Sequence, residues 1–408
     1  MSITISALSP RQIAGLSTTA IASLSTTSVG ALSTSQVAAL AATQVNALVS
    51  TDLQYLVTTQ IAALSPSVIS HLLTLQLQTF LDTQIAEFTA TQVGVLTATE
   101  IGALSSTELQ ALTTTQANAL TSTQLRGLTT TVLGNFTTTQ IGALTTTQVP
   151  GLTTTQLNAL SVEVLNVLDV SKATATQIGG LTTTAIAALT DTQLGALTGA
   201  QVANLSTDQI GALTSTEVQA FTTTQANALT ATQLGGLTTT ELGLFATGQI
   251  NALSTTQVQG LTTDQLNAVS IDLLDALDLS KFGNAQVSGL STTAITNLTE
   301  TQVGTLTATQ VPALSAAQIG ALTTTEISNL NTDQAGALTS TQVAGLTTTY
   351  FAALSATTGI PSLSTAAIAG ISTEDIYALT ATQGNAFAQT QIDAMTLAQT
   401  QALIELVT

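Results

Sequence analysis

An eight-residue repeat runs through this chain of 408 residues and constrains its fold more than any other feature. A typical copy is Thr137-Thr138-Thr139-Gln140-Ile141-Gly142-Ala143-Leu144, and the general pattern is [Ser/Thr]-Thr-x-Gln-[Ile/Val]-x-[Ala/Gly]-Leu. The closing Leu or Phe recurs every eight residues from Leu8 to Leu168. The length corresponds to about fifty such octads. A chain of this kind is expected to form a solenoid, in which each repeat packs only on its neighbours.

The spacing of the apolar residues excludes one continuous helix. Eight residues advance an α-helix by about 800°, so the leucine stripe would move by about 80° with every octad. Such a stripe leaves no fixed face to bury. Strands stay open as an alternative, because Thr and Ile favour them and paired octads could form the coils of a β-solenoid.

The first four residues of the octad match a capping box, which starts a helix. The hydroxyl of Thr137 would accept a hydrogen bond from the backbone N–H of Gln140, and the Gln140 side chain would accept one from the N–H of Thr137. Some octads carry Glu in place of Gln and keep the frame, for example at Ser105–Glu108 and Thr214–Glu217. We therefore expect a short helix to begin again in every octad.

The prolines fit the same frame. Pro10 and Pro66 directly follow the expected cap, at the first helical position, where the missing N–H costs nothing. Pro150 and Pro312 lie further along their octads and would remove an early helical hydrogen bond. The predicted fold is therefore all-α, a solenoid of short capped helices with one helix per octad, and the β-solenoid is the alternative.

A second period of 109 residues lies above the octad. Five extra residues interrupt the register at 169–173 and again at 278–282, and we interpret both as longer helices inserted into one continuous array over residues 1–408. They would act either as corners that reset the register of the solenoid or as docking points for another copy or another partner. The candidate contacts are Asp169, Lys172, Asp278, Lys281 and Phe282, with same-face ion pairs expected within each segment. A minor break lies near residues 356–361.

The acidic balance of the chain excludes some classes of binding partner. The chain has 4 Lys and Arg against 22 Asp and Glu, a net charge of −18. Nucleic-acid binding needs clustered cations, so no nucleic-acid partner is expected. No run of eighteen apolar residues occurs, so no insertion into a membrane is expected either. The acidic residues Asp208, Asp264 and Asp333 precede the Gln of their octads and suit the first turn of a helix.

The sequence lacks the residues of common active sites. His71 is the only histidine and there is no cysteine, so neither a usual zinc site nor a catalytic triad can be assembled without that one histidine. No Asp-rich loop of the density required for calcium is present. We expect no enzymatic activity, no cofactor and no metal.

The octads resemble threonine-rich octapeptide tracts of secreted or surface proteins of proteobacteria, as in the strings Leu-Thr-Thr-Thr-Gln-Ile-Gly-Ala-Leu and Leu-Ser-Thr-Thr-Gln-Val-Gln-Gly-Leu. The acidic, cysteine-free balance is also similar to surface-layer proteins. The resemblance implies an extracellular or cell-surface location, reached without a usual signal peptide. The leading hypothesis is a structural protein that self-assembles into a filament, sheath or surface layer. The alternative is an adhesin-type or Thr-faced module that binds carbohydrate, a cell surface or ice, and glycans are the partner class it adds.

Overall fold

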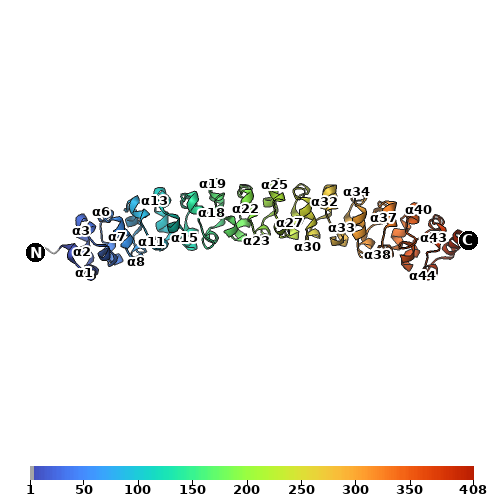
Figure 1. Ribbon diagram of the computed structural model, residues 1–408, viewed down its shortest axis with the longest axis horizontal. Helices are drawn as coiled ribbons and strands as arrows, with labels where there is room; N and C mark the ends of the chain where they lie inside the picture. Colours follow the sequence, from blue (N-terminus) through green and yellow to red (C-terminus); the bar gives the residue numbers. More distant parts are fainter. Residues whose placement is uncertain (1–3) are drawn as a thin grey trace. The chain divides into compact units, whose positions relative to one another are not determined.

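Short helices account for all the regular structure of the described part of the chain. The computed structural model describes residues 4–408, and no strand occurs among them. The chain divides into two compact units, one ending at Leu205 (unit 1) and the other beginning at Ser206 (unit 2). In each unit successive short helices are connected into a stacked coil (Figure 1). The predicted all-α solenoid is confirmed, and the β-solenoid alternative is wrong.

The helices of unit 1 have the following bounds. They are η1 (Ile5–Ala7), α1 (Pro10–Ala14), α2 (Thr18–Ala22), α3 (Thr26–Gly30), α4 (Thr34–Ala38), α5 (Ala42–Val45), α6 (Ser50–Gln54), α7 (Thr58–Ala63), α8 (Pro66–Ile69), α9 (Thr74–Leu77), α10 (Asp82–Ala86), α11 (Ala90–Gly94), α12 (Ala98–Gly102), α13 (Ser106–Ala111), α14 (Thr114–Ala117), α15 (Ser122–Gly127), α16 (Thr130–Gly134), α17 (Thr138–Gly142), η2 (Val149–Gly151), α18 (Thr154–Ala159), α19 (Val162–Leu165), η3 (Val170–Lys172), α20 (Ala175–Gly179), α21 (Thr183–Ala187), α22 (Asp191–Gly195) and α23 (Gly199–Val202).

The helices of unit 2 continue the same pattern. They are α24 (Thr207–Gly211), α25 (Ser215–Gln219), α26 (Thr223–Ala226), α27 (Ala231–Gly236), α28 (Thr239–Leu242), α29 (Thr247–Asn251), α30 (Thr255–Val258), α31 (Thr263–Ala268), α32 (Ile271–Asp275), η4 (Leu279–Lys281), α33 (Asn284–Gly289), α34 (Thr292–Thr296), α35 (Glu300–Thr305), η5 (Val311–Ala313), α36 (Ala316–Ile319), α37 (Thr324–Ser328), α38 (Thr332–Gly336), α39 (Ser340–Ala344), α40 (Thr348–Ala352), η6 (Ile360–Ser362), α41 (Thr365–Ile368), α42 (Thr373–Tyr377), α43 (Ala381–Gly384), α44 (Gln389–Ile392) and α45 (Leu397–Val407).

The predicted caps are present. In α17 the Thr137 hydroxyl accepts from the Gln140 N–H at 3.2 Å, and Gln140 Oε1 accepts from the Thr137 N–H at 2.8 Å. The same two bonds close the boxes that contain Glu, at Ser105–Glu108 and Thr214–Glu217. Pro10 and Pro66 begin α1 and α8 at the first helical position. Octads with a capping box therefore restart a helix for the reason that the sequence indicated.

The late prolines change the type of helix. In the octads of Pro150 and Pro312 the backbone forms the 3₁₀ turns η2 and η5 instead of an α-helix. Pro361, at the minor break near residues 356–361, does the same in η6. A proline at this place has no N–H to give to a carbonyl four residues back, so the turn tightens.

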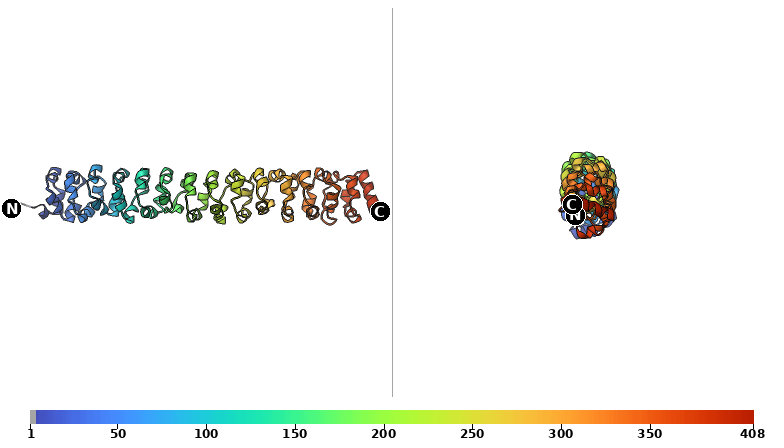
Figure 2. Two further views of the ribbon diagram at one scale, coloured as in Figure 1. Left: turned by 90° about the horizontal axis from the view of Figure 1, so that it is seen from above. Right: turned by 90° about the vertical axis from the view of Figure 1, so that its right-hand side faces the viewer.

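Helices stack on one another with a regular offset. Within unit 1, α1 contacts α4, and α4 contacts α7. Within unit 2, α24 contacts α27, and α36 contacts α39. Each of these helices packs on the third octad along the chain, and the turned views show the successive layers within a unit (Figure 2). No helix of a few residues would be stable alone, so this stacking holds the fold together.

The core is a spine of two apolar residues per octad. Ile141 and Leu144 are 1% and 2% exposed, and the equivalent residues of nearly every octad are buried. Ala117 takes the Ile position in one octad and is equally buried. The helix α45 is longer than the others, with eleven residues, and packs across α42 and α43. Within residues 4–408 there is no helix with the length and apolar character needed to cross a membrane.

Candidate functional site

The glutamine of the octad has a second bonding role besides the cap. Gln140 is 2% exposed, and its Nε2 donates to the backbone oxygens of Leu109 and Leu112 at 2.8 and 2.6 Å. These two residues precede it by 31 and 28 positions, in the fourth octad back. Each stacked helix packs on the third octad along the chain, whereas the glutamine bonds to the fourth octad back. One turn of the solenoid therefore takes between three and four octads.

This pair of bonds repeats along both units and forms what we call the glutamine ladder. The same 31- and 28-residue offsets and distances of 2.7–3.0 Å occur at Gln44, Gln92, Gln249, Gln318 and Gln391. One oxygen caps the helix of its own octad while one nitrogen satisfies buried carbonyls of the previous turn. A capping box accepts Glu as readily as Gln, so the strong preference for Gln was the signal that sequence reasoning missed.

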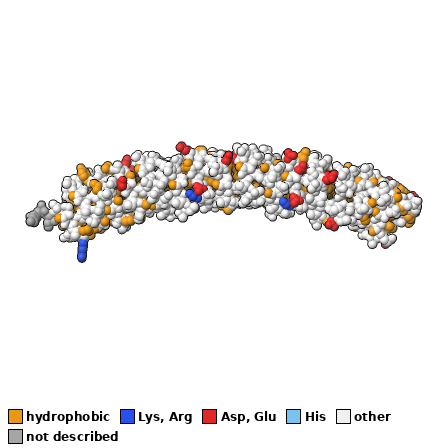
Figure 3. Space-filling model, viewed as in Figure 1, with side chains coloured by type: hydrophobic (Ala, Val, Ile, Leu, Met, Phe, Trp, Pro, Cys, Tyr) orange, Lys and Arg blue, Asp and Glu red, His pale blue; other side chains and the backbone are white. Residues whose placement is uncertain are grey.

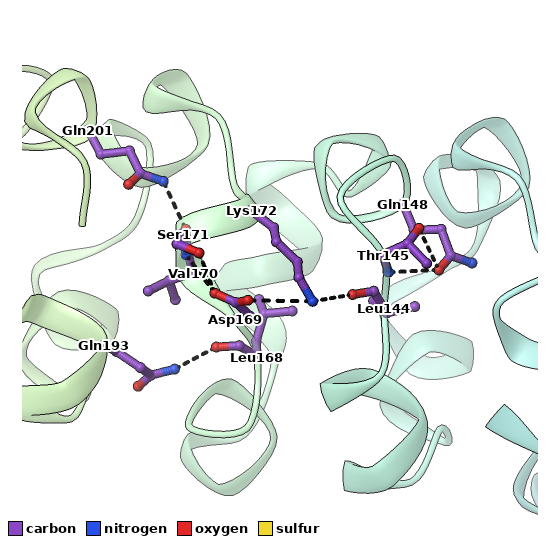
Figure 4. A network of polar contacts seen from close by, with 10 residues as sticks. All are labelled: Leu144, Thr145, Gln148, Leu168, Asp169, Val170, Ser171, Lys172, Gln193 and Gln201. Atoms are coloured by element: carbon purple, nitrogen blue, oxygen red, sulfur yellow. Dashed lines mark hydrogen bonds and ion pairs between the residues drawn. The ribbon is translucent and has the colours of Figure 1, made fainter. Parts of the chain in front are cut away.

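The segment 169–173 is a shortened repeat, which corrects the expectation of a longer helix. It forms a single 3₁₀ turn, η3, after the four-residue helix α19. Val170 and Ala173 are buried in the spine, and their carbonyls accept from Gln201 Nε2 at 2.8 and 2.7 Å. Five residues therefore fill the place of an octad, because the spine needs only two apolar side chains and two carbonyls (Figure 4).

Lys172 replaces the missing glutamine of this short repeat. Its Nζ donates to Leu144 O at 2.8 Å, with the ladder's own offset of 28 residues, and pairs with Asp169 at 3.5 Å (Figure 4). The predicted ion pair is therefore present here. A hydrogen bond from the Ser171 hydroxyl, helped by the Lys172 charge, lowers the pKa of Asp169 below its ordinary 3.8. The ionised carboxylate stabilises the fold above that ordinary pKa, and this contribution is lost as pH falls through the lowered value.

The segment 278–282 repeats the arrangement with one difference. Lys281 Nζ donates to Leu253 O at 2.8 Å, and the carbonyls of Leu279 and Phe282 accept from Gln310. Phe282 is 3% exposed and belongs to the core. Among the described residues no ion pair closes between Asp278 and Lys281, so the pair expected there is absent. The role of Asp169, Lys172, Asp278, Lys281 and Phe282 as subunit contacts stays a prediction.

Replacing Lys172 by Met should lower the free energy of unfolding by about 1–2 kcal/mol, because Leu144 O loses its charged donor while the alkyl stem still packs. Urea unfolding followed by circular dichroism measures the change. Lys281→Met is the matched control: it removes the same carbonyl contact without an ion pair, so the two effects should differ by less than about 1 kcal/mol. An unchanged midpoint for both variants would contradict the replacement role.

Asp52 marks a place where the ladder is interrupted. It occupies the glutamine position of α6, is 2% exposed, and its Oδ2 has no hydrogen-bond partner within residues 4–408. The ladder offsets of 31 and 28 residues point from this position to the carbonyls of Ile21 and Leu24. A short carboxylate can neither reach nor donate to them.

We therefore expect Asp52→Gln to raise the free energy of unfolding by about 1–2 kcal/mol, since it supplies the missing donor and removes a buried unpaired oxygen. Thermal unfolding measures the gain. Asp52→Leu removes the charge without adding a donor and should give a smaller gain. Equal effects of the two variants would show that the ladder bond is not formed there.

A group of exposed apolar residues replaces hydroxyl caps in one part of unit 1. The cap positions of α6, α7, α9 and α10 carry Val49, Val57, Leu73 and Leu81, which are 53%, 53%, 59% and 47% exposed. We call these four residues the apolar caps. Their backbone angles match those of capping threonines, yet none makes a side-chain cap bond. Sequence reasoning did not single them out.

His71 lies on the surface of unit 1. Its Nδ1 is 2.8 Å from Ser67 O and 3.1 Å from the Ser70 hydroxyl, so the ring is held by residues just before it in the chain. In the part of the chain that the structure describes, no group of three or more His, Cys, Asp or Glu side chains comes together as a metal site would require.

Parts of the chain are similar to a known family of repeats. The family model described as ALTTAQ repeat matches residues 5–42, 119–154, 174–207, 202–239 and 311–348. No curated protein matches the chain. Among solved structures, the leucine-rich repeat-containing protein LegL7 from Legionella pneumophila is 13% identical over 56% of this chain and 78% of its own, with a TM-score of 0.17, which is too low to carry an argument. The chain is thus similar to ALTTAQ repeats at several positions, which supports a threonine-rich repeat protein family.

Proposed function

We propose that this protein is a non-enzymatic structural scaffold that acts outside the cell and self-associates into a filament, sheath or surface layer. The single observation that carries the proposal is the set of apolar caps. A solenoid offers a long repetitive surface, and here the cap positions of α6, α7, α9 and α10 present Val or Leu to solvent where most other octads present Ser or Thr. Apolar side chains that are exposed together in one region of a surface are typical of interaction sites, and we infer that the apolar caps form such a site.

The apolar caps reduce the stability of the isolated chain. Loss of a Ser or Thr cap costs about 1 kcal/mol, and side chains that stay about half exposed recover little of it within one molecule. Burial against a second copy would recover more, at about 25 cal/mol per Å² of apolar surface. The second copy is the favoured occupant because a repetitive surface can meet the same surface of another chain.

The charge of the chain sets the condition for assembly. The face shown in Figure 3 carries few charged side chains. The net charge of −18 nevertheless opposes contact between copies. At 0.1 M salt such repulsion between exposed charges is screened beyond about 10 Å. Assembly is therefore expected to be weak at low ionic strength and to strengthen with added salt.

The test replaces the four apolar caps by the residue that the repeat prefers, in the combined variant Val49→Thr, Val57→Thr, Leu73→Thr and Leu81→Thr. The backbone is already set for a capping hydroxyl, so each change should add up to about 1 kcal/mol of stability. Self-association should fall at the same time. Light scattering and electron microscopy measure self-association, and thermal unfolding measures stability. A loss of assembly together with a gain in stability would show that the apolar caps form a contact surface. A gain in stability alone would show that they affect only the fold.

Ala41→Thr is the matched control. Ala41 also occupies a cap position without a side-chain bond, but it is small. The Ala41→Thr variant should be more stable than the parent and should assemble to the same extent. A parent protein that stays monomeric at high concentration and physiological salt would overturn the proposal, and a monomer that binds carbohydrate would favour the binding module instead. Fractionation of the producing cells tests the location, and a purely cytosolic protein would contradict it.

A further inference from the structure

One octad of unit 2 lacks the apolar side chain that most other octads contribute to the spine. In the octad of residues 380–387, Gly384 stands where most octads carry Ile, Val or Leu. The long helix α45 lies over this place, because a Cβ at Gly384 would come within 2.8 Å of Val407 Cγ1 and 2.9 Å of Leu406 Cδ2. Helix α45 therefore packs directly on the backbone of α43, where an ordinary spine side chain would not fit.

This packing leaves a cavity of about 310 Å³ beside Gly384. Phe387 and Leu403 are 6% exposed and form its buried wall, whereas Ile404 is 49% exposed, so the cavity opens to solvent beside that residue. Protein sites for small molecules begin at about 300 Å³, and an apolar cavity of about 150 Å³ already binds benzene. The apolar part of the lining consists of Phe387, Ile392, Leu403, Ile404 and Val407.

The helix that forms one side of the cavity is held in place by the protein itself. Helix α45 packs on α42 and α43, and the Tyr377 hydroxyl donates to Glu405 Oε2 at 2.7 Å. The glutamine ladder also extends into α45, since Gln399 Nε2 donates to Ile368 O and Ile371 O at 2.9 and 2.7 Å. The cavity is therefore preformed, and a ligand would not have to order the helix on binding.

The polar side chains of the lining are both neutral. Thr400 Oγ1 donates to Thr396 O at 3.0 Å, which uses its only hydrogen and leaves the oxygen as an acceptor. Asn385 Nδ2 donates to Ala381 O at 2.9 Å, and an amide of this kind still has a second N–H and its carbonyl oxygen. A ligand hydroxyl, which can both donate and accept, matches this pair of side chains.

The charges near the cavity disfavour an anionic ligand. No Lys or Arg belongs to the lining. The exposed acids Asp393 and Glu405 directly follow the lining residues Ile392 and Ile404 in the chain. A carboxylate placed in the cavity would therefore lose water without gaining a counter-charge, which is costly.

We propose that this cavity binds a small uncharged amphiphile, an aliphatic alcohol of roughly eight carbon atoms, since a cavity of half this volume holds the six carbons of benzene. Its chain packs against Phe387, Leu403 and Val407, and its hydroxyl bonds to Asn385 and Thr400. Burial of the chain also covers part of the half-exposed Ile404 side chain. The apolar surface removed from water supplies the affinity, and the two polar side chains supply the preference for a neutral head group.

The experiment titrates 1-octanol into the full chain by isothermal calorimetry, with octanoate as the matched anionic ligand. We expect one molecule of 1-octanol to bind per chain and octanoate to bind more weakly by about tenfold or more, because its charge has no partner in the cavity. The titration is repeated on the variant whose four apolar caps are replaced by Thr. Binding should persist there, because the caps lie in unit 1 and do not line the cavity.

Two substitutions in the lining test the site. Thr400→Leu fills part of the cavity and places a good helix former in α45, so the variant should fold and bind 1-octanol about tenfold more weakly or worse. Asn385→Leu keeps the size of the side chain and removes its hydrogen-bonding groups, so it should weaken binding by about fivefold.

Asn227→Leu is the matched control. Asn227 is the C-cap of α26 with φ −71° and ψ −12°, close to the −70° and −9° of Asn385 at the C-cap of α43, and it does not line the cavity. This variant should bind 1-octanol as the parent does.

Four results would overturn the assignment. Absence of binding by the parent would remove the site, and equal affinity for octanoate would show that the head group is not recognised. Unchanged binding in Thr400→Leu, or the same loss in Asn227→Leu as in Asn385→Leu, would place the alcohol elsewhere on the chain.

Discussion

Gln140→Glu is expected to lower the free energy of unfolding by about 3 kcal/mol. The glutamate can still accept from the Thr137 N–H, so the cap survives. Both bonds from Nε2 to Leu109 O and Leu112 O disappear, and each lost bond costs about 0.5–1.5 kcal/mol. The new carboxylate is also buried opposite two carbonyl oxygens, which adds the cost of an unpaired charge. This variant therefore tests the two bonds that one glutamine contributes to the glutamine ladder.

Urea unfolding followed by circular dichroism measures this loss, and hydrogen exchange shows whether it is confined to the turns that contain α13 and α17. Repeat arrays can unfold in parts, so the local measurement matters. Thr139→Glu is the control, because it adds the same charge at the neighbouring exposed position and should change stability by less than about 0.5 kcal/mol. Equal effects of the two variants would show that added charge, and not the ladder, governs stability.

Phe88→Ala is expected to cost about 3–5 kcal/mol. Phe88 is 2% exposed at the closing position of its octad, and its ring meets that of Phe80 edge-on with centroids 5.8 Å apart. Truncation leaves a cavity between two turns and removes the aromatic contact, which is worth a further 0.5–1.5 kcal/mol in pairs of this kind. The loss is expected to be large because only two apolar residues per octad hold each turn to the next.

Phe88→Leu is the control for this prediction. Leu is the usual residue at the closing position, so the turn should adapt to it at a cost below about 1.5 kcal/mol. Thermal unfolding compares the two variants with the parent. A loss as large for Leu as for Ala would mean that the aromatic pair, and not the filling of the spine, stabilises this turn.

Much of the local structure could be predicted from the sequence. The capping boxes, the prolines at the first helical position and the spine residues Ile141 and Leu144 follow from short-range rules, because each cap bond joins residues three apart. The effect of Pro150 is equally local. The all-α solenoid followed from repeating these signals along the chain.

The segment 169–173 could not be interpreted correctly from the same rules. Its spacing of apolar residues suggested a longer helix, and the Asp169–Lys172 ion pair fitted that interpretation. The structure shows a 3₁₀ turn, because Lys172 must reach Leu144 in an earlier turn and the spine must accept Val170. Competition between a local helix and a contact 28 residues away is decided only when the turns are stacked.

In a regular octad, the capping box and the apolar pattern are enough to predict where the helix begins and which two residues are buried. Those properties depend on neighbours within a few positions. The number of octads in one turn and the bonds from Gln140 to the fourth octad back follow only from the way the turns stack. The physical reason is that these bonds join residues 31 and 28 positions apart, and their geometry exists only after neighbouring turns have packed.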